Sequence, residues 1–475
     1  MAVLWSSADI VAAVAGRLEG AVFEASRIVI DSRTLQKGDF FVALKGPVAD
    51  GHDYLAEAAH KGAAGALVHR FDTSVSLPQV VVGDTYEGLC QLAHAARERS
   101  KACVVAVTGS FGKTSTKEAL RLMLQDQGQV TANDRSFNNH WGVPYTLANL
   151  GPSDDYGVFE VGMNHAGEIT PLSMMVRPHV ALITTIGEAH IENLGSLEAI
   201  ADAKAEIFAG MEPGNTAVLN ADNPHYQQLR EKALSKGLQV LAFGRAPDAE
   251  AQILEVQSTA EGQEIQAEIC GESLSLTLQV TGEHWAHNML GALTAVWATG
   301  ADVHQAAKSL QAFRLLSGRG ERHRVALGAG EILVIDESYN ASPSAMLAAI
   351  DVLQQTPIAG TGRRIAVLGD MLELGEDSAH HHQRVAEALA AAGIDAVFTS
   401  GPRARVIYDH VPPAMRQLHH EDVSEVAKAV AAYVRPGDVV MVKGSRGQRA
   451  YEGRMSTVVK ALLALSQGPG QARSA

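Results

Sequence analysis

The segment V-V-A-V-T-G-S-F-G-K-T-S-T, residues 104–116, constrains the fold of this chain more than any other segment. Its first residues are small or β-branched and apolar, which predicts a buried strand of a parallel sheet. A glycine-rich turn follows and leads through Lys113 and Thr114 into a helical pattern that starts at Lys117. The order strand, glycine turn and helix predicts an α/β fold built on a parallel sheet.

The same segment has the chemistry of a phosphate-binding loop. Gly109 and Gly112 let the backbone turn its N–H groups toward an anion. Lys113 can reach the outer phosphates, and the hydroxyl of Thr114 can hold Mg²⁺. The alternative is a tight strand-to-helix turn with a chance Gly-Lys-Thr, which the strand before it and the helix after it disfavour. Val107 stands where the usual loop has a further glycine, so this loop is a shortened form. We expect the chain to bind a nucleoside triphosphate.

The 475 residues are too many for one hydrophobic core and predict several domains. Residues 1–98 mix short strands with alanine-rich helices. Residues 99–315 repeat strand and helix, with strands expected at 103–107, 158–162, 180–185 and 216–220. Residues 251–281 alternate apolar and polar side chains, which predicts a small antiparallel layer appended to the parallel sheet, followed by a helix at 284–298.

The strand and helix alternation restarts after a glycine-rich junction at residues 315–320, with strands expected at 332–336, 365–368, 396–399 and 439–442. The fold class we expect is therefore α/β with three domains. They are a small mixed α/β N-terminal domain (1–98), a central P-loop parallel-sheet ATPase domain with an antiparallel layer (99–315), and a C-terminal Rossmann-like domain (316–475).

The formal net charge of −14 argues against a general nucleic-acid or anionic-membrane surface. The three cysteines, Cys90, Cys103 and Cys270, are widely spaced and suit packing positions in a reducing compartment. No signal peptide pattern and no apolar run of membrane-spanning length is evident. We expect a cytoplasmic monomer.

Glu160 interrupts an apolar strand near its carboxyl end, where ligands gather in open α/β sheets. A buried carboxylate is costly unless it is paired or bound to a metal, and Mg²⁺ prefers oxygen ligands. The alternative is a glutamate that faces solvent through the pleat. His190 ends another strand-to-loop stretch and is a reasonable supplementary metal ligand, although a lone loop histidine more often only forms hydrogen bonds.

Lys204 falls within the apolar stripe of a helical segment expected over residues 197–211. A lysine on a buried face needs a reason. It either snorkels to solvent or, near a metal, carries a CO₂-derived carbamate that offers carboxylate-like oxygens. The sequence leaves both open.

Three further residues can touch a nucleotide. Asn288 can read a purine edge, although by pattern alone a helix cap is favoured. Arg319, between two glycines, is a mobile cation at the expected domain junction. Asp336 ends the first strand expected in the last domain, where the alternative is an Asx/Pro turn that caps the next helix.

Together these segments resemble the Mur ligases of bacterial cell-wall synthesis, from about residue 31 to residue 447. The matching blocks are Thr108–Ser115, Asn138–Pro144, Glu160–Asn164, Gly187–His190 through Lys204, and Asp336–Pro343. The second and the last of these, with Gly369–Gly375, resemble the members that add a dipeptide. The Asp-Asn-Pro-Arg pattern of the members that add diaminopimelate is absent. Glu337 and Ser342 stand where the family often has Asp and Asn.

The resemblance implies that the first domain binds a UDP-sugar, the middle one ATP, and the last closes over the site. It implies ATP contacts from the loop, from Asn288 to adenine, and from Arg319 and Asp336 to phosphate and ribose; the loop residues are Thr108, Gly109, Ser110, Gly112, Lys113, Thr114 and Ser115. The implied substrate contacts are Ser32, Arg33, Lys45, Asn138, Asn139 and Asn340. The implied catalytic or metal residues are Lys113, Thr114, Glu160, His190 and Lys204. Lys204 matches a lysine that is carbamylated and helps hold the second of two Mg²⁺ ions.

The implied reaction is ATP-dependent addition of D-alanyl-D-alanine to UDP-N-acetylmuramoyl-tripeptide, through an acyl phosphate, in peptidoglycan precursor synthesis. A sister ligase that adds a different amino acid is the nearest alternative. A non-catalytic protein on a ligase scaffold is disfavoured because Lys113, Glu160 and Lys204 are retained together. A simple P-loop kinase or ATPase would need neither the first nor the last domain.

Overall fold

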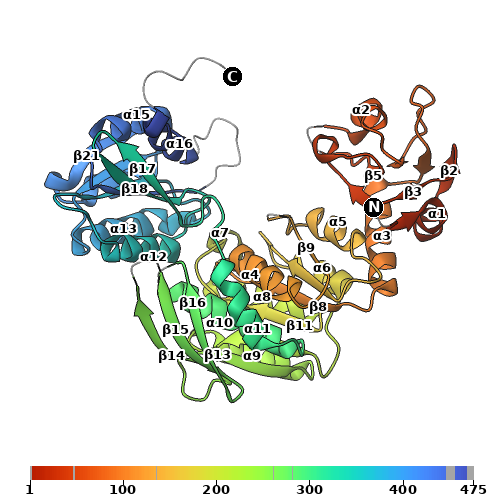
Figure 1. Cartoon of the computed structure of the whole chain (residues 1–475), viewed down its shortest axis with the longest axis horizontal. Coiled ribbons are helices and arrows are strands. Elements are labelled where there is room, and N and C mark those ends of the chain that lie inside the picture. The colour runs from red at the N-terminus through yellow and green to blue at the C-terminus, as the bar shows by residue number, and fades with distance from the viewer. Residues whose placement is uncertain are drawn as a thin grey trace.

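The structure is a computed structural model that describes residues 3–46, 49–134, 136–259, 262–280, 282–445 and 455–467. Three large sheets follow one another along the chain, and Figure 1 shows them as an N-terminal unit at the upper right, a central unit below, and a C-terminal unit at the upper left. In the described part of the chain, no helix is long and apolar enough to cross a membrane.

The N-terminal unit is a five-stranded sheet in the order β2-β7-β6-β5-β4, parallel except where β2 pairs with β7. Its strands are β2 (Arg17–Glu19), β4 (Arg27–Val29), β5 (Asp39–Val42), β6 (Gly65–Val68) and β7 (Gln79–Val81), with a β1 (Trp5–Ser6) and β3 (Glu24–Ala25) pair beside them. Its helices are α1 (Ser7–Val14), η1 (Ser32–Thr34), η2 (Gly51–Tyr54), α2 (Leu55–His60) and α3 (Thr85–Arg99).

The central unit is a nine-stranded sheet in the order β16-β15-β14-β13-β12-β11-β8-β10-β9. The strands are β8 (Cys103–Thr108), β9 (Val130–Ala132), β10 (Tyr156–Glu160), β11 (Val180–Ile183), β12 (Thr216–Asn220), β13 (Gln239–Gly244), β14 (Ala251–Ser258), β15 (Gln263–Ile269) and β16 (Glu272–Leu278). β8 lies between β10 and β11 and is parallel to both, as its apolar run predicts. The predicted antiparallel layer is an extension of the same sheet, since β14 pairs in parallel with β13 and antiparallel with β15.

Helices cover both faces of this sheet: α4 (Lys113–Gln125), α5 (Gly142–Ala148), α6 (Ile169–Val176), α7 (Ile191–Leu194), α8 (Leu197–Ala205), η3 (Glu206–Phe208), α9 (Tyr226–Ser235), α10 (Glu283–Ala298), α11 (Val303–Ser309) and η4 (Leu310–Ala312). Two expectations need correction. α4 begins at Lys113 rather than Lys117, and the helix expected over residues 197–211 ends at Ala205, after which η3 continues as a tighter turn.

The C-terminal unit is a six-stranded sheet in the order β17-β18-β22-β19-β20-β21, parallel except for β17. Its strands are β17 (Glu321–Leu327), β18 (Gly330–Glu337), β19 (Arg364–Gly369), β20 (Ala396–Ser400), β21 (Arg416–His420) and β22 (Val439–Lys443). Its helices are α12 (Pro343–Gln355), η5 (Gly375–Asp377), α13 (Ser378–Ala391), α14 (Arg405–His410), η6 (Pro413–Met415), α15 (Val423–Tyr433), α16 (Ser456–Ala464) and η7 (Leu465–Gln467).

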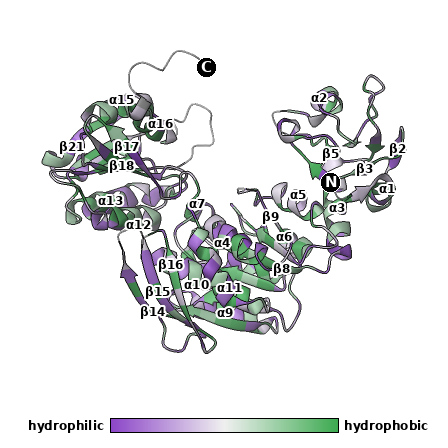
Figure 2. Cartoon of the chain, in the orientation of Figure 1, coloured by the Kyte–Doolittle hydropathy of each residue, from purple (hydrophilic) through white to green (hydrophobic). Residues whose placement is uncertain are grey.

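The hydrophobic cores follow this arrangement. One core joins the N-terminal and central units, because Trp5 and Phe40 belong to the same cluster as Val104 and Val143. Trp5 also donates from Nε1 to the carbonyl of Ala148 over 2.9 Å. The C-terminal sheet buries cores of its own on both faces. Figure 2 shows hydrophobic strands near β8, whereas much of β14 and β15 is hydrophilic. The three cysteines are free and half-buried, as expected for packing residues.

Candidate active site

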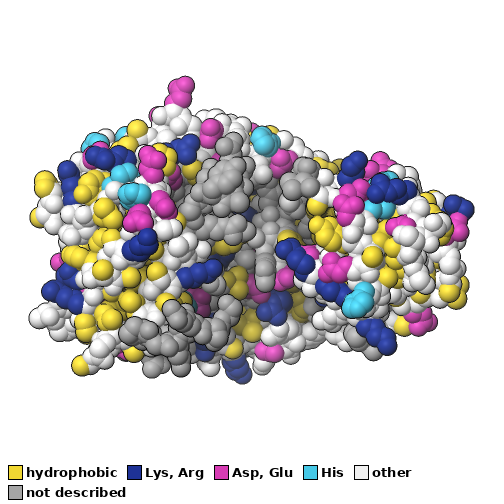
Figure 3. All heavy atoms as spheres, turned by 90° about the horizontal axis from the view of Figure 1, so that it is seen from above, with side chains coloured by type: hydrophobic (Ala, Val, Ile, Leu, Met, Phe, Trp, Pro, Cys, Tyr) yellow, Lys and Arg dark blue, Asp and Glu magenta, His cyan; other side chains and the backbone are white. Residues whose placement is uncertain are grey.

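A cavity of about 1240 Å³ lies between the central and C-terminal units. Its walls come from loops at the carboxyl ends of β8, β10 and β11 on one side and of β18 and β22 on the other. Figure 3 views the molecule from above and shows Lys, Arg, Asp and Glu side chains near the middle of this face. The carboxyl ends of the strands are the location at which open α/β sheets bind ligands.

The phosphate loop forms one wall. Gly109 (φ 144°) and Gly112 (φ 79°) have backbone conformations that side chains disfavour. A Cβ at Gly109 would lie 2.0 Å from Oγ1 of Thr184, and one at Gly112 would lie 2.8 Å from the amide of Asn288. Asn288 is in the second turn of α10, whose N-cap is Gly282, so the helix-cap interpretation of Asn288 is wrong. The two glycines therefore let the loop lie against β11 and α10.

Lys113 folds over its own loop. Its Nζ donates to the carbonyls of Gly109 and Ser110 at 2.7 and 3.4 Å. Burial lowers the pKa of Lys113, the carboxylate of Glu160 raises it, and the guanidinium of Arg319 lowers it. A bound phosphate would add negative charge beside this ammonium group and stabilise its charged form.

The hydroxyl-bearing residues of the loop differ in their surroundings. Thr114 and Ser115, in the first turn of α4, line the cavity. Thr108 is completely buried beneath the loop. Ser110 donates from Oγ to the carbonyl of Gly187 and accepts from the Gly187 N–H, at 2.9 and 3.0 Å. Ser110 therefore joins the phosphate loop to the loop that carries His190.

Glu160 is the last residue of β10 and only 1 % exposed, so the solvent-facing interpretation is wrong. Its Oε1 accepts from Nδ2 of Asn138 at 2.6 Å, and its N–H donates to Oδ1 of Asn133 at 2.5 Å. Oε2 is buried with no hydrogen-bond partner among the described residues. An unpaired buried carboxylate oxygen at the wall of a cavity that Thr114 also lines is a donor that suits a divalent cation.

His190 lines the same cavity from the loop after β11. Its Nδ1 lies 2.6 Å from Oε2 of Glu373, which comes from the loop after β19 in the C-terminal unit. The close contact with His190 is the largest cause that lowers the pKa of Glu373. No local sequence pattern indicates this contact between His190 and Glu373.

Lys204 is 1 % exposed, so its side chain does not snorkel to solvent. Burial lowers the pKa of Lys204 well below 10.5, and the charge of Lys113 lowers it further. Within the described residues, Nζ of Lys204 makes no hydrogen bond or ion pair. Burial disfavours the ammonium form of this amine, and a neutral amine is the form that reacts with CO₂.

The C-terminal wall is organised around Arg319. The guanidinium stacks on the ring of Tyr339 at 4.0 Å, so Arg319 is held in place rather than mobile. The Tyr339 hydroxyl lies 2.6 Å from Oγ of Ser136 in the central unit. Asp336 is buried outside the cavity lining, and its carboxylate accepts the N–H groups of Gly318 and Ser338, both at 3.0 Å. Asp336 thus shapes the turn that presents Arg319, in part as an Asx turn.

The predicted asparagines lie at the cavity. Asn138, Asn139 and Asn340 all line it. Asn138 holds Glu160, whereas Asn139 accepts through Oδ1 the N–H groups of Trp141 and Gly142, at 3.2 and 3.0 Å, at the start of α5. Asn340 is exposed at the cavity wall.

The predicted N-terminal residues lie outside this cavity. Ser32 is buried and donates to Oε2 of Glu57 at 3.0 Å, Arg33 is exposed and pairs with Asp31, and Lys45 is exposed. The loop of Lys45 nevertheless approaches the central unit, since a Cβ at Gly46 would lie 3.2 Å from the ring of Trp141.

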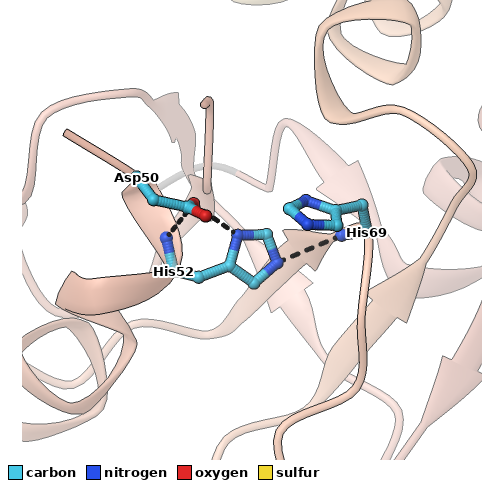
Figure 4. A group of neighbouring side chains, drawn as sticks. All are labelled: Asp50, His52 and His69. Carbon is cyan, nitrogen blue, oxygen red and sulfur yellow. Dashed lines mark hydrogen bonds and ion pairs between the residues drawn. The ribbon is translucent and has the colours of Figure 1, made fainter. Parts of the chain in front are cut away.

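Asp50, His52 and His69 place ligand-type atoms close together near this loop (Figure 4). Both ring nitrogens of His52 are already engaged: Nδ1 with Oδ1 of Asp50 at 2.9 Å, and Nε2 with the N–H of His69 at 3.2 Å. The guanidinium of Arg70 lies 3.7 Å from Oδ2 of Asp50 and opposes a cation. The cluster therefore holds the loop rather than a metal.

The structure adds cavity residues that the sequence reasoning missed. Lys443 is 3 % exposed and donates from Nζ to Oε2 of Glu337 at 3.1 Å. It follows an apolar strand at its carboxyl end, which is the signal that identified Glu160. His284 lines the cavity one helical turn before Asn288, and burial lowers its pKa. Helical spacing from Asn288 could have identified it.

Comparison with known proteins gives a consistent result. Three family models match the chain: "Mur ligase family, catalytic domain" over residues 24–99, "Mur ligase middle domain" over 107–296, and "Mur ligase, glutamate ligase domain" over 318–446. The chain is 35 % identical over 450 residues to the UDP-N-acetylmuramoyl-tripeptide–D-alanyl-D-alanine ligase of Escherichia coli (strain K12), covering 94 % of this chain and 96 % of the relative.

Solved structures agree with this similarity. A crystal structure of MurF from Acinetobacter baumannii matches with a TM-score of 0.83 and 30 % identity, covering 97 % of this chain and 98 % of that one. MurF ligase from Thermotoga maritima, solved in complex with ADP, matches with a TM-score of 0.77 and 27 % identity, covering 93 % and 98 %. The α/β three-domain architecture expected from the sequence is thus confirmed.

Proposed function

The chain belongs to the Mur ligase family, and on that premise we propose that it joins D-alanyl-D-alanine to UDP-N-acetylmuramoyl-tripeptide at the expense of ATP. The products are the extended UDP-linked peptide, ADP and phosphate. The relative with this printed name covers 94 % of the chain, so the similarity is not confined to the ATP-binding segment.

One observation carries the proposal most directly. A single cavity is lined by the phosphate loop, by Glu160 and His190, and by Arg319 and Asn340 from the other unit. A simple ATPase needs no second wall of this kind, whereas a ligase must hold ATP, an acceptor carboxylate and an incoming amine together.

The reaction overcomes a poor electrophile. A carboxylate repels an amine and has no adequate leaving group. Transfer of the γ-phosphoryl group of ATP to the carboxylate gives an acyl phosphate and ADP. The dipeptide amine then attacks the carbonyl carbon, the tetrahedral intermediate collapses, and phosphate departs as the amide forms. The ammonium group of the incoming dipeptide also loses a proton, which is taken up by the solvent or by a base.

The chain's own residues supply positioning and positive charge. Lys113 and Arg319 face the cavity and neutralise phosphate oxygens. Thr114, Glu160 and His190 would hold Mg²⁺, which when bound polarises the phosphoryl group and neutralises developing charge. The buried, unpaired Oε2 of Glu160 supports this assignment. Exclusion of water between the two walls would protect the acyl phosphate from hydrolysis.

Lys204 acts as a carbamate in this proposal, and a second Mg²⁺ ion uses its oxygens. As an ammonium it would repel the cation, whereas a carbamate converts it into an anionic ligand. Its burial, its lowered pKa and its lack of a partner among the described residues support this conversion.

The substrate assignments follow the cavity and its edge. Asn138, Asn139 and Asn340 line the cavity and Asn288 faces the phosphate loop, the last assigned to adenine. Ser32, Arg33 and Lys45 are assigned to the UDP group; Gly46 of their unit approaches Trp141, which follows the cavity-lining His140. Asp336 acts on ATP through the turn that carries Arg319.

We also propose domain boundaries at residues 98/99 and 315/316. The first falls one residue before the end of α3, and the second falls between η4 and β17. A monomer in the cytoplasm suits a reaction that consumes ATP and a UDP-linked precursor.

Replacement of Lys113 by alanine tests the assignment. The variant should form no acyl phosphate, detected by hydroxylamine trapping, yet still bind the UDP-linked tripeptide, because the two functions belong to different units. Lys101→Ala is the matched control: Lys101 is an exposed lysine at the opposite end of β8. Loss of both functions in Lys113→Ala would contradict the division of roles.

Turnover with a single amino acid and a shorter acceptor would favour the sister ligase. Binding of nucleotide without any turnover would favour a non-catalytic scaffold. Phosphate release that ignores the amine would favour a simple ATPase.

A further inference from the structure

Glu373 and His190 meet across the two walls of the cavity. His190 follows β11 of the central sheet and Glu373 follows β19 of the C-terminal sheet. Oε2 of Glu373 lies 2.6 Å from Nδ1 of His190, although the geometry is not that of a linear hydrogen bond. The contact nonetheless ties the position of the His190 ring to that of Glu373.

The contact is built into the backbone on both sides. His190 (φ 64°) and Glu373 (φ 62°) both adopt the left-handed conformation, which is unfavourable for residues with a side chain. The N–H of Glu192 donates to the carbonyl of Glu373 at 3.2 Å, beside the side-chain contact. Strained residues of this kind persist when their surroundings specify them, and they cluster at functional sites.

The loop that carries Glu373 is itself fixed within the C-terminal unit. The N–H of Met371 donates to Nε2 of His382, and the N–H of Leu372 donates to Oγ of Ser445, both at 3.1 Å. Glu373 therefore moves with the C-terminal sheet, and the contact depends on where that sheet lies relative to the central unit.

We propose that Glu373 is a positioning residue for His190: its carboxylate, 2.6 Å from Nδ1, holds the orientation of the ring, and so makes metal binding by His190 depend on the position of the C-terminal unit. This inference rests on the proposed function only in taking His190 as a metal ligand. A carboxylate on the second nitrogen of a ligating histidine fixes its tautomer and orientation, and its loss typically weakens metal binding about 10–100-fold.

The test measures metal binding rather than turnover. Mn²⁺ is titrated into the full-length protein with ADP present, and free Mn²⁺ is followed by electron paramagnetic resonance. We expect Glu373→Ala to bind Mn²⁺ at least about tenfold more weakly. Glu373→Asp should lie between this variant and the parent. Glu376→Ala is the matched control, because Glu376 is an exposed carboxylate in the same segment without a described contact.

A double-mutant cycle separates positioning from general stability. His190→Ala should weaken Mn²⁺ binding, and adding Glu373→Ala to it should weaken binding no further. Equal Mn²⁺ affinity in Glu373→Ala and the parent, or additive losses in the double variant, would overturn the proposal. Should Glu373→Ala fail to fold, the same double-mutant cycle made with Glu373→Asp tests the proposal. Because the readout is Mn²⁺ affinity, a parent protein without ligase activity would overturn the proposed function and leave this result standing.

Discussion

Asn138 donates a hydrogen bond from Nδ2 to Oε1 of Glu160 over 2.6 Å, while Oε2 of the same carboxylate is buried without a partner among the described residues. The amide fixes the orientation of the carboxylate, and Asn133 fixes the backbone beneath it. One oxygen is thus used for positioning and the other is left for a ligand. This division explains why a costly buried carboxylate is placed at the end of an apolar strand.

Asn138→Ala should weaken activation by Mg²⁺ about 10–100-fold, because Glu160 loses the group that orients it. The measurement is the Mg²⁺ dependence of phosphate release. Asn215→Ala is the control: Nδ2 of Asn215 also makes a structural hydrogen bond, to the carbonyl of Pro178, but Asn215 precedes β12, at the amino ends of the parallel strands and away from the cavity lining. Unchanged Mg²⁺ dependence in Asn138→Ala would remove Glu160 from the metal site.

Gly112→Ala should abolish nucleotide binding. The added Cβ would meet the Asn288 amide at 2.8 Å as well as straining a left-handed residue. Gly214→Ala has the strain alone, since Gly214 has φ 89° and nothing within 4 Å of a Cβ; it should lose about 1–2 kcal/mol of stability and keep nucleotide affinity. Calorimetric titration with ADP measures the nucleotide affinity of each variant. Equal ADP affinity in both variants would show that the approach of Asn288 to the loop is unimportant.

Lys204→Ala should nearly abolish ligation, because a metal ligand is lost. Short carboxylates such as acetate should restore part of the activity by occupying the vacated space, as expected for a carbamate but not for an ammonium group. The parent should also lose activity in CO₂-depleted buffer and recover with bicarbonate. Near-normal activity of Lys204→Ala would remove Lys204 from the site.

His52 should make the N-terminal unit sensitive to acid (Figure 4). Burial is the largest cause that lowers the pKa of His52 below 6.5. Above about pH 6.5 the ring is neutral in both the folded and the unfolded chain. Below that pH, the unfolded chain takes up a proton that the folded chain resists, so the folded state becomes less stable as the pH decreases. His52→Asn should be less stable than the parent at about pH 8 and closer to it at about pH 5.5, by thermal unfolding. A stability difference between the parent and His52→Asn that becomes larger in acid would contradict this prediction.

The parallel strands and the phosphate loop could be predicted because their signals are local. β8 is a continuous apolar run, and β12 has the residues that the sequence predicts. The start of α4 could not be predicted, because the turn from Lys113 to Thr116 has no apolar residue and so no helical periodicity.

The edge strands show the opposite case. β17 reads E-R-H-R-V-A-L and β21 reads R-Q-L-H-H, and both lie at the edges of the C-terminal sheet. Edge strands have one unpaired side and carry charged residues, so they lack the apolar pattern by which central strands are identified. Their pairing is set by the sheet rather than by their own residues.

The candidate site divides in the same way. Glu160 and Lys204 could be singled out because a charge interrupts an apolar pattern. Glu373 could not be assigned to His190, because nothing local to either segment specifies a contact between two loops that are far apart in sequence. Asn288 was misjudged as a cap although the helix expected at 284–298 begins, as α10, at Glu283, and that start puts Asn288 in the second turn.

Phosphate release from ATP and Mg²⁺ in the presence of UDP-N-acetylmuramoyl-tripeptide, with and without D-alanyl-D-alanine, tests the central claim most directly. We expect release that depends on both substrates, and a product whose mass exceeds that of the acceptor by one dipeptide minus one water. Release that does not depend on the dipeptide, or a product extended by a single amino acid, would contradict the proposed function.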